Sequence, residues 1–509
     1  MYFSGMFIRK NKNRSGTVSI QIVEKINRTN RIVKTVGVAS TPREEELLIL
    51  LAKSQLSQIQ GMQSLFVEHD DLVVENFVNT LSSGDLQIVG PELILAPIYQ
   101  KIGYPEDGSR NYFKALVLSR LVYPGSKLKT VNYFKQHFNL DVSVYSIYRF
   151  LDELSSTMKQ QIEQSTFAHT KSVMGGSIGV VFYDMTSLYF EASEPDDFRI
   201  SGYSKDGKHQ HPQILIGLLV SGQGYPIGYK LFEGNTSEAN TLLPALEFYQ
   251  SRFGVGKPIV VADAALLSQR NIDALRTGGY EYILGGRLKN ESQAVKDRIF
   301  DASITEARPM EFPHRNGRLI VTYSKKRAHK DKDNRKKGLK RLENRVKSGK
   351  LSKQHINNRG YNKYLRLSGQ AHISIDYEKF EADQRWDGLK GYLTNTTLSK
   401  DQVIANYRHL WHIEKAFRIS KTDLRIRPVY HRLKSRIEAH ICICFAAYAV
   451  YKELERQLII NEVGLSVQQA LGETKEIRQL RYRLPKSNTM KTQLLNPNEN
   501  QTKLMNMKI

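Results

Sequence analysis

The sequence contains very little cysteine and no long apolar run. Cys442 and Cys444 are its only cysteines, so cysteine can supply neither a disulfide framework nor a four-ligand zinc site. The most apolar stretch, residues 441–451, is about eleven residues long, well short of the roughly 18–20 that cross a bilayer. The N-terminus lacks the apolar core of a signal peptide. These absences predict a cytoplasmic protein without a membrane-spanning helix.

Acidic residues are scarce relative to basic ones. The 509 residues include 75 Lys and Arg against 51 Asp and Glu, a formal net charge of +24, and 40% are hydrophobic. This hydrophobic content is enough for a folded core, so the charge belongs to a globular protein that meets a polyanion. Composition alone leaves nucleic acid and an anionic membrane as candidates. Residues 321–370 hold 17 Lys and Arg against 3 Asp and Glu, so much of the excess charge is local.

Hydrophobic periodicity predicts an α/β protein with several regions. Residues 178–190, 214–220 and 227–232 are β-branched and aromatic with short turns between them, which predicts three antiparallel strands; alternating strands and helices after them predict parallel additions to the sheet. The predicted regions are a β-meander at 1–40, a helical region at 41–172, a mixed sheet at 173–288, a basic inserted subdomain at 289–386, the rest of the sheet domain at 387–460, and a polar tail at 461–509 that is partly disordered after about residue 468.

Three acidic residues occupy positions typical of functional sites. Asp184 lies in a strand of apolar neighbours, where a carboxylate must be compensated; the alternative is a structural partner such as an arginine. Asp263 follows the strand 259–262, where ligand sites lie in such sheets, although it also suits a helix cap. Glu414 lies in a predicted helix, 402–422, on the face that carries Trp411 and Leu410; the alternative is a solvated glutamate. Together the three carboxylates suit two Mg²⁺ or Mn²⁺ ions and phosphoryl transfer on nucleic acid.

Other polar motifs give no comparable signal. His209 and His211 lack further ligands at zinc-site spacing, so we interpret them as polar loop residues. Residues 202–208 (GYSKDGK) lack the phosphate-loop pattern. Residues 143–154 predict a capped helix, in which Tyr145, Tyr148 and Arg149 belong either to a helix-turn-helix or to an ordinary packed helix.

Several stretches together resemble a known family. They are YDMTSLYFE at 183–191, GYSKDGK at 202–208, FEGNTSE at 232–238, VVAD at 260–263, WHIEKAFR at 411–418 and RPVYH at 427–431. In this order they resemble the IS4 superfamily of bacterial insertion-sequence transposases with a DDE site, and most closely its IS1634 family. The superfamily's signature is Tyr, two residues, Arg, three residues, Glu, six residues and Lys. Tyr407, Glu414 and Lys421 match it, whereas Leu410 occupies the Arg position and Arg408 lies two residues earlier.

The resemblance implies a fold and an activity. It implies an RNase H-like mixed sheet flanked by helices and interrupted by the basic insertion, with Asp184, Asp263 and Glu414 holding two Mg²⁺ or Mn²⁺ ions. It also implies cleavage at transposon ends and transfer of the 3′-hydroxyl into target DNA, by a homo-oligomer on double-stranded DNA in the bacterial cytoplasm, associated with the nucleoid and not with a membrane. From the signature and the basic run, the predicted DNA-binding residues are Tyr407, Arg408, Lys421, Lys325, Lys326, Arg327, Arg335, Lys336 and Lys337.

Two alternatives share these features. One is a transposase-derived DNA-binding protein that has lost cleavage; the intact acids oppose this and Leu410 favours it. The other is an RNase H-like nuclease, which would need neither Lys421 nor so large a basic insertion.

Overall fold

A computed structural model describes most of the chain. The described residues are 5–26, 29–59, 69–106, 112–137, 141–154, 156–191, 194–202, 207, 210–254, 256–349, 351, 353–357, 360–368, 372–484 and 487–509. The chain divides into two compact units, Met1–Leu86 with Leu480–Gln493, and Gln87–Gln479 with Leu494–Ile509. The two units are described separately below.

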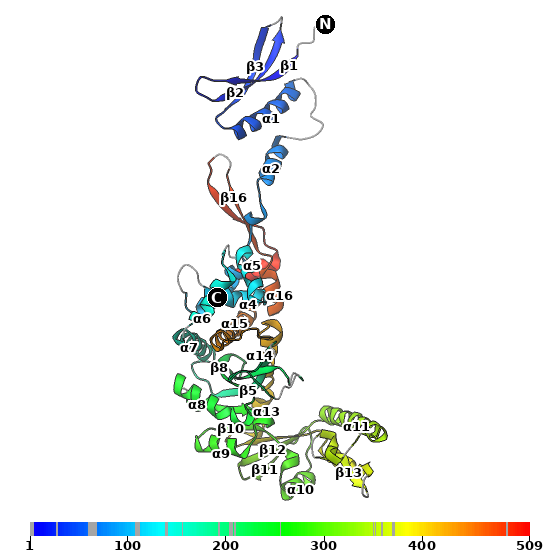
Figure 1. Ribbon diagram of the computed structural model, residues 1–509. Helices are drawn as coiled ribbons and strands as arrows, with labels where there is room; N and C mark the ends of the chain where they lie inside the picture. Colours follow the sequence, from blue (N-terminus) through cyan, green and yellow to red (C-terminus); the bar gives the residue numbers. More distant parts are fainter. Residues whose placement is uncertain are drawn as a thin grey trace. The chain divides into compact units, whose positions relative to one another are not determined.

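The first unit begins with the predicted β-meander. The strands β1 (Met6–Lys12), β2 (Val18–Ile26) and β3 (Thr29–Ala39) pair antiparallel in sequence order. Helix α1 (Pro42–Ile59) packs on this sheet (Figure 1), where Ile20, Ile22 and Ala52 form a small core. The unit also contains α2 (His69–Asn79) and most of the strand pair β16 (Arg478–Arg483) and β17 (Met490–Leu494). The predicted meander is therefore confirmed.

The second unit has a helical part built around one long helix. Helix α15 (Lys434–Ile460) is buried along most of its length because neighbouring helices cover it. The elements that precede the main sheet are β4 (Leu86–Ile88), α3 (Gly90–Ile102), α4 (Tyr112–Val122), α5 (Lys127–His137), α6 (Val144–Glu153) and α7 (Ser156–Val173). Among the described helices, none combines the length and the apolar character that a membrane span requires.

A nine-stranded mixed sheet forms the centre of the second unit. Its order is β11-β12-β15-β10-β9-β5-β7-β6, and β8 also pairs with β7. Strands β5, β7 and β8 are antiparallel neighbours, whereas β9 and β10 run parallel to β5, as predicted. The strands are β5 (Val180–Tyr189), β6 (Ile200–Ser201), β7 (Pro212–Ser221), β8 (Pro226–Glu233), β9 (Ile259–Ala262), β10 (Tyr282–Gly286), β11 (Met310–His314), β12 (Gly317–Tyr323) and β15 (Leu389–Thr394).

Helices cover both faces of this sheet. Alternate side chains of β5 and β9 point to opposite faces. Tyr183 and Ala262 share a core with α8 (Leu242–Phe253) and α9 (Gln269–Thr277). Phe182 and Val261 belong to the core that contains α13 (Lys400–Arg408), α14 (Trp411–Arg418) and α15. The predicted α/β fold, a mixed sheet flanked by helices, is confirmed.

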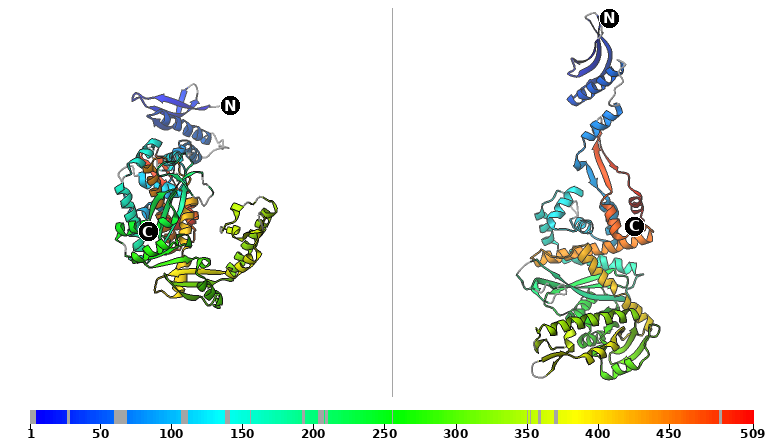
Figure 2. Two further views of the ribbon diagram at one scale, coloured as in Figure 1. Left: turned by 60° about the horizontal axis from the view of Figure 1, so that its bottom comes forward. Right: turned by 90° about the vertical axis from the view of Figure 1, so that its right-hand side faces the viewer.

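The inserted subdomain is smaller than the sequence predicts. Residues 289–323 contribute α10 (Gln293–Asp301) and the strands β11 and β12, which extend the main sheet, so the predicted boundary at 289 is wrong. The chain leaves the sheet after Tyr323 and returns at Leu389, its paired residue on β15. Between them lie α11 (Lys325–Lys347), β13 (Leu365–Ser368), β14 (His372–Ile375) and α12 (Tyr377–Ala382). Figure 2 shows this segment, in yellow-green and yellow, projecting from the end of the sheet that holds β11 and β12.

The C-terminal tail differs from its prediction. The polar composition after residue 468 predicts partial disorder, but the chain forms α16 (Val467–Thr474) and α17 (Glu499–Met505). Leu504 and Met507 are buried in the main core of the second unit. A few apolar residues at helical spacing anchor this polar segment, and its average composition hides them.

Candidate active site

Asp184 and Asp263 lie on adjacent parallel strands. Tyr183 of β5 pairs with Ala262 of β9, and the two aspartates directly follow this pair. Asp184 is half-buried, and its carboxylate accepts a hydrogen bond from the backbone N–H of Met185 at 2.7 Å. Asp263 is exposed and accepts from the N–H of Ala264 at 2.6 Å, capping a single 3₁₀ turn. The capping role considered for Asp263 is therefore present, and its Oδ2 has no hydrogen-bond partner among the described residues.

Glu414 lies on a shorter helix than the sequence predicts. Instead of one helix over 402–422, the chain forms α13, a tight turn at His409 and Leu410, α14, and a π-helical turn at Ile419–Asp423. At the break, the N–H of Leu410 donates to the carbonyl of Tyr407, three residues back. Along α14, Ile413, Ala416 and Phe417 are buried, whereas Glu414 is exposed.

The predicted burial of Glu414 on an apolar face is therefore wrong. Of the two neighbours on which that prediction depended, Leu410 is buried, whereas Trp411 is 49% exposed. A constant helical period cannot show a break in the helix, because the positions that share a face change there.

A cavity of about 1000 Å³ brings several predicted residues together. Asp263 lines it from the end of β9, Tyr407 and Arg408 from α13, and Glu414 from α14, and the opposite wall is the inserted segment, including Arg327 and Arg335. Asp184 is not among its lining residues. Lys421 instead hydrogen-bonds Thr186, which lies two residues after Asp184 and so on the same side of β5.

Tyr407 and Lys390 interact with the acidic residues that line the cavity. The buried hydroxyl of Tyr407 donates to Oδ1 of Asp263 at 3.4 Å. Burial, and then the charge of Asp263, raise the pKa of Tyr407, which keeps it a donor. Lys390 Nζ lies 4.4 Å from the centre of the Tyr407 ring. Burial and Arg327 lower the pKa of Lys390, while Asp263 and Glu414 oppose this shift, so its ammonium lies in the field of both acids.

Sequence reasoning missed Lys390. The available signal was a lysine inside the apolar strand 389–394, a position where a charged side chain needs compensation.

The carboxylates of Asp184, Asp263 and Glu414 are suitable ligands for a hard divalent cation, although in this structure they do not converge on a single position. Two aspartates from neighbouring strands and a glutamate from the helix on the same face offer the oxygen ligands that Mg²⁺ and Mn²⁺ prefer. Within the described part of the chain, no three His, Cys, Asp or Glu side chains are close enough to hold a metal ion.

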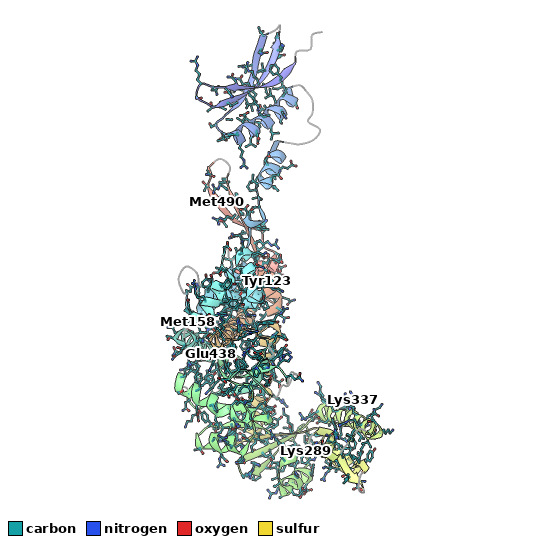
Figure 3. The ribbon with its side chains drawn as sticks, viewed as in Figure 1. Tyr123, Met158, Lys289, Lys337, Glu438 and Met490 are labelled. Carbon is teal, nitrogen blue, oxygen red and sulfur yellow. The ribbon has the colours of Figure 1, made fainter. Side chains whose placement is uncertain are left out.

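Helix α11 presents a row of cations on its exposed side. It contains 12 Lys and Arg against 3 Asp and Glu, and Lys325, Lys326, Arg327, Lys336 and Lys337 are all exposed. Figure 3 labels Lys337 on this helix and Lys289, a cavity residue. The basic run therefore forms one exposed surface of the insert.

Arg335 is placed differently from the other predicted DNA-binding residues. It is 8% exposed, donates to the Asp387 carboxylate at 2.7 Å and lies over the Phe380 ring. Its guanidinium is used inside the subdomain, so the structure gives no support to a DNA contact by this residue.

The remaining sequence candidates are also located. The helix predicted at 143–154 is α6, capped by Ser143, whose Oγ accepts from the N–H of Ser146. Tyr145 is exposed, Arg149 pairs with Glu153, and Tyr148 packs against His431. His211 lies near the carbonyl of Phe190. His209 and most of the 202–208 motif lie outside the described residues.

Comparison with known families identifies the domain that carries the acids. The model of the transposase DDE domain matches residues 175–450, just over half of the chain. The chain belongs to this family of transposases. The matched range includes Asp184, Asp263, Glu414 and the basic insert of this transposase. No curated protein matches the chain.

Solved structures of other transposases show distant similarity. A piggyBac transposase in a synaptic complex with hairpin DNA is 9% identical over 76% of each chain, with a TM-score of 0.38. The Mos1 transposase in a paired-end complex with the left transposon end is 15% identical over 35% of this chain and 60% of that one, with a TM-score of 0.15.

Proposed function

We propose that this DDE-family protein is the transposase of a bacterial insertion sequence of the IS4 superfamily, closest to its IS1634 family. It would cleave DNA at the terminal inverted repeats and join the 3′-hydroxyl to target DNA, acting in the cytoplasm as a homo-oligomer on double-stranded DNA. One observation carries the proposal: within the matched domain, the acids lie on adjacent strands and on the helix of the same face, and two of them, Asp263 and Glu414, line a large cavity that a basic segment borders.

Asp184, Asp263 and Glu414 are the proposed ligands of two Mg²⁺ or Mn²⁺ ions in an RNase H-like domain. A bound divalent cation stabilises the charge that develops on a phosphate during strand cleavage. The chain's own residues prepare the site: Tyr407 orients Asp263 through its hydroxyl, and Lys390 offsets the negative charge of Asp263 and Glu414.

The proposed DNA contacts follow from exposed cations around the cavity. Arg408 and Lys289 line its walls, and the exposed lysines of α11 continue from it. Phosphates of a duplex would neutralise these side chains. Lys421 would contact the backbone near Asp184, since its ammonium lies on that side of β5.

A cleavage and joining assay tests this function. Purified protein with Mg²⁺ is mixed with a DNA fragment that ends in the element's own inverted repeats and with a target plasmid. A transposase cuts at the repeat ends and joins them to the plasmid. A nuclease of similar fold would cut without joining, and a protein that has lost cleavage would bind without cutting; either result contradicts the proposal.

Neutralising α11 is expected to weaken DNA binding for all sequences alike. Each of Lys336→Ala and Lys337→Ala should lower the slope of log affinity against log salt by about one, because each removes a phosphate contact. Fluorescence anisotropy at several salt concentrations measures this slope. Lys171→Ala, an exposed lysine of α7, is the matched control and should keep the slope. Unchanged slopes for both α11 variants would contradict the proposed contact.

Removing the Tyr407 hydroxyl is expected to slow cleavage about 10- to 100-fold, the usual cost of losing a hydrogen bond to a metal ligand. Tyr407→Phe keeps the buried ring beside Tyr392, so stability should change little. Single-turnover cleavage measures the effect. Tyr392→Phe, whose hydroxyl bonds only weakly to Thr322 at 3.5 Å, is the control. Equal rates for Tyr407→Phe and the wild type would remove the positioning role.

A further inference from the structure

A second cavity, of about 370 Å³, carries positive charge without any acid. Its lining includes Arg120 of α4, Lys127 at the start of α5, Tyr148 of α6, Arg427 and His431 of the loop before α15, and His440 of α15. The lining residues that the structure describes contain no aspartate or glutamate. None of the three proposed metal ligands lines it, so this cavity is distinct from the one beside α14.

Arg120 and Lys127 are deeply buried, with only 5% and 6% of their surface exposed. Across the described residues, neither side chain has a hydrogen bond or ion pair. A buried cation without a partner is costly unless an anion compensates it. Two such cations facing one cavity therefore indicate that the cavity receives a negative group.

The surroundings disfavour further positive charge beside Arg120, so an anion in the cavity would stabilise it. Burial, and then the charge of Arg120, lower the pKa of Lys127 to about 7. Burial, followed by Arg120 and Lys127, also lowers the pKa of His440. The carboxylate that acts on His431 is Asp152, and it already accepts two hydrogen bonds from Arg436, at 2.7 and 2.6 Å. Among the described residues, no acid of the site is thus left to balance the cations.

A helix N-terminus also suits a phosphate. The N-terminus of the eleven-residue helix α5 borders the cavity, and backbone N–H groups at a helix start attract anions. The ring of His440 donates from Nε2 to the carbonyl of Ile426, at 3.0 Å. Its Nδ1 is fully buried, so a phosphate in the cavity would meet the two cations and the helix N-terminus rather than this atom.

We propose that this cavity binds a phosphate group through the side chains of Arg120 and Lys127. The group comes either from free phosphate or from the DNA backbone. At the rim, Arg425 and Tyr430 are exposed, and Tyr430 retains 69% of its surface, so the cavity opens to solvent.

Thermal unfolding of the full chain tests phosphate binding directly. Inorganic phosphate should raise the melting temperature of the wild type but not that of Lys127→Met. In phosphate-free buffer, Lys127→Met should melt no lower than the wild type, because methionine fills the space without burying a charge. Arg149→Met, an exposed arginine of α6, is the matched control and should keep the phosphate response. A Lys127→Met protein that melts well below the wild type would give the lysine a structural role and overturn the proposal.

Binding of a DNA duplex without terminal phosphates distinguishes the two sources. If the group belongs to DNA, Lys127→Met should weaken binding and lower the salt slope by about one. If it is free phosphate, the variant should bind DNA like the wild type but lose the phosphate response.

Calorimetric titration of the wild type with phosphate is independent of any variant. The proposal fails if phosphate does not bind and Lys127→Met binds DNA unchanged. Because only binding is measured, failure here leaves the proposed cleavage activity intact.

Discussion

Asp263→Ala is expected to lower the rate of DNA strand cleavage by about a thousandfold or more and to leave the affinity for duplex DNA nearly unchanged. The proposed cation stabilises developing charge by several kcal/mol, and each ~1.4 kcal/mol is a factor of ten in rate. The carboxylate is exposed at the cavity, so its loss leaves no buried charge unpaired; it removes the acceptor of the Tyr407 hydroxyl, which lines the same cavity. Single-turnover cleavage of an end-bearing fragment, with anisotropy for binding, measures both quantities.

Asp184→Ala and Glu414→Gln should show losses of the same order. Because residues that act as one unit are strongly non-additive, the double variant Asp263→Ala with Glu414→Gln should be little worse than either single one. Glu247→Gln, an exposed carboxylate of α8, controls for lost charge. Three single variants that cut as fast as the wild type would refute the metal-site proposal.

Gly234→Ala is expected to destabilise the sheet domain by about 3 kcal/mol or more. A Cβ at this position would lie 2.0 Å from the carbonyl oxygen of Ile200 and 2.1 Å from that of Gln213. Both obstacles are backbone atoms of neighbouring strands, which cannot rotate away. The side chain of Gln213 also donates to the Gly234 carbonyl at 3.0 Å, which fixes the close approach.

A second glycine provides the matched control. Gly222, in the turn between β7 and β8, has open space on the side where a Cβ would lie, with no other atom within 4 Å of that position. Gly222→Ala should therefore change stability by less than about 0.5 kcal/mol. Chemical denaturation of both variants measures the difference, and a Gly234→Ala protein as stable as Gly222→Ala would contradict the packing argument.

The sheet could be predicted from sequence because its strands are apolar, β-branched and separated by short turns. The same pattern located Asp184 within β5 and Asp263 after β9. The direction of Glu414 could not be predicted, since it depends on the break after α13 and on tertiary packing of Ile413 and Phe417. Local periodicity records neither.

On α11, the charge pattern of the sequence could not show which basic residues face solvent. The sequence groups Arg335 with Lys336 and Lys337, but only the fold shows that Arg335 faces Asp387 while the two lysines face solvent. Lys390 was missed because it is a single lysine in an apolar strand and belongs to no cluster of charged residues in the sequence. Counting charges located a basic segment and could not assign roles within it.

The pairing of Tyr323 with Leu389 has a consequence for how this protein could change over evolution. The whole segment between them enters and leaves at neighbouring positions of two antiparallel strands, so a short hairpin turn could replace it without altering the pairing of β12 and β15. The segment can therefore be lengthened, exchanged or lost while the strands that position Asp263 stay as they are.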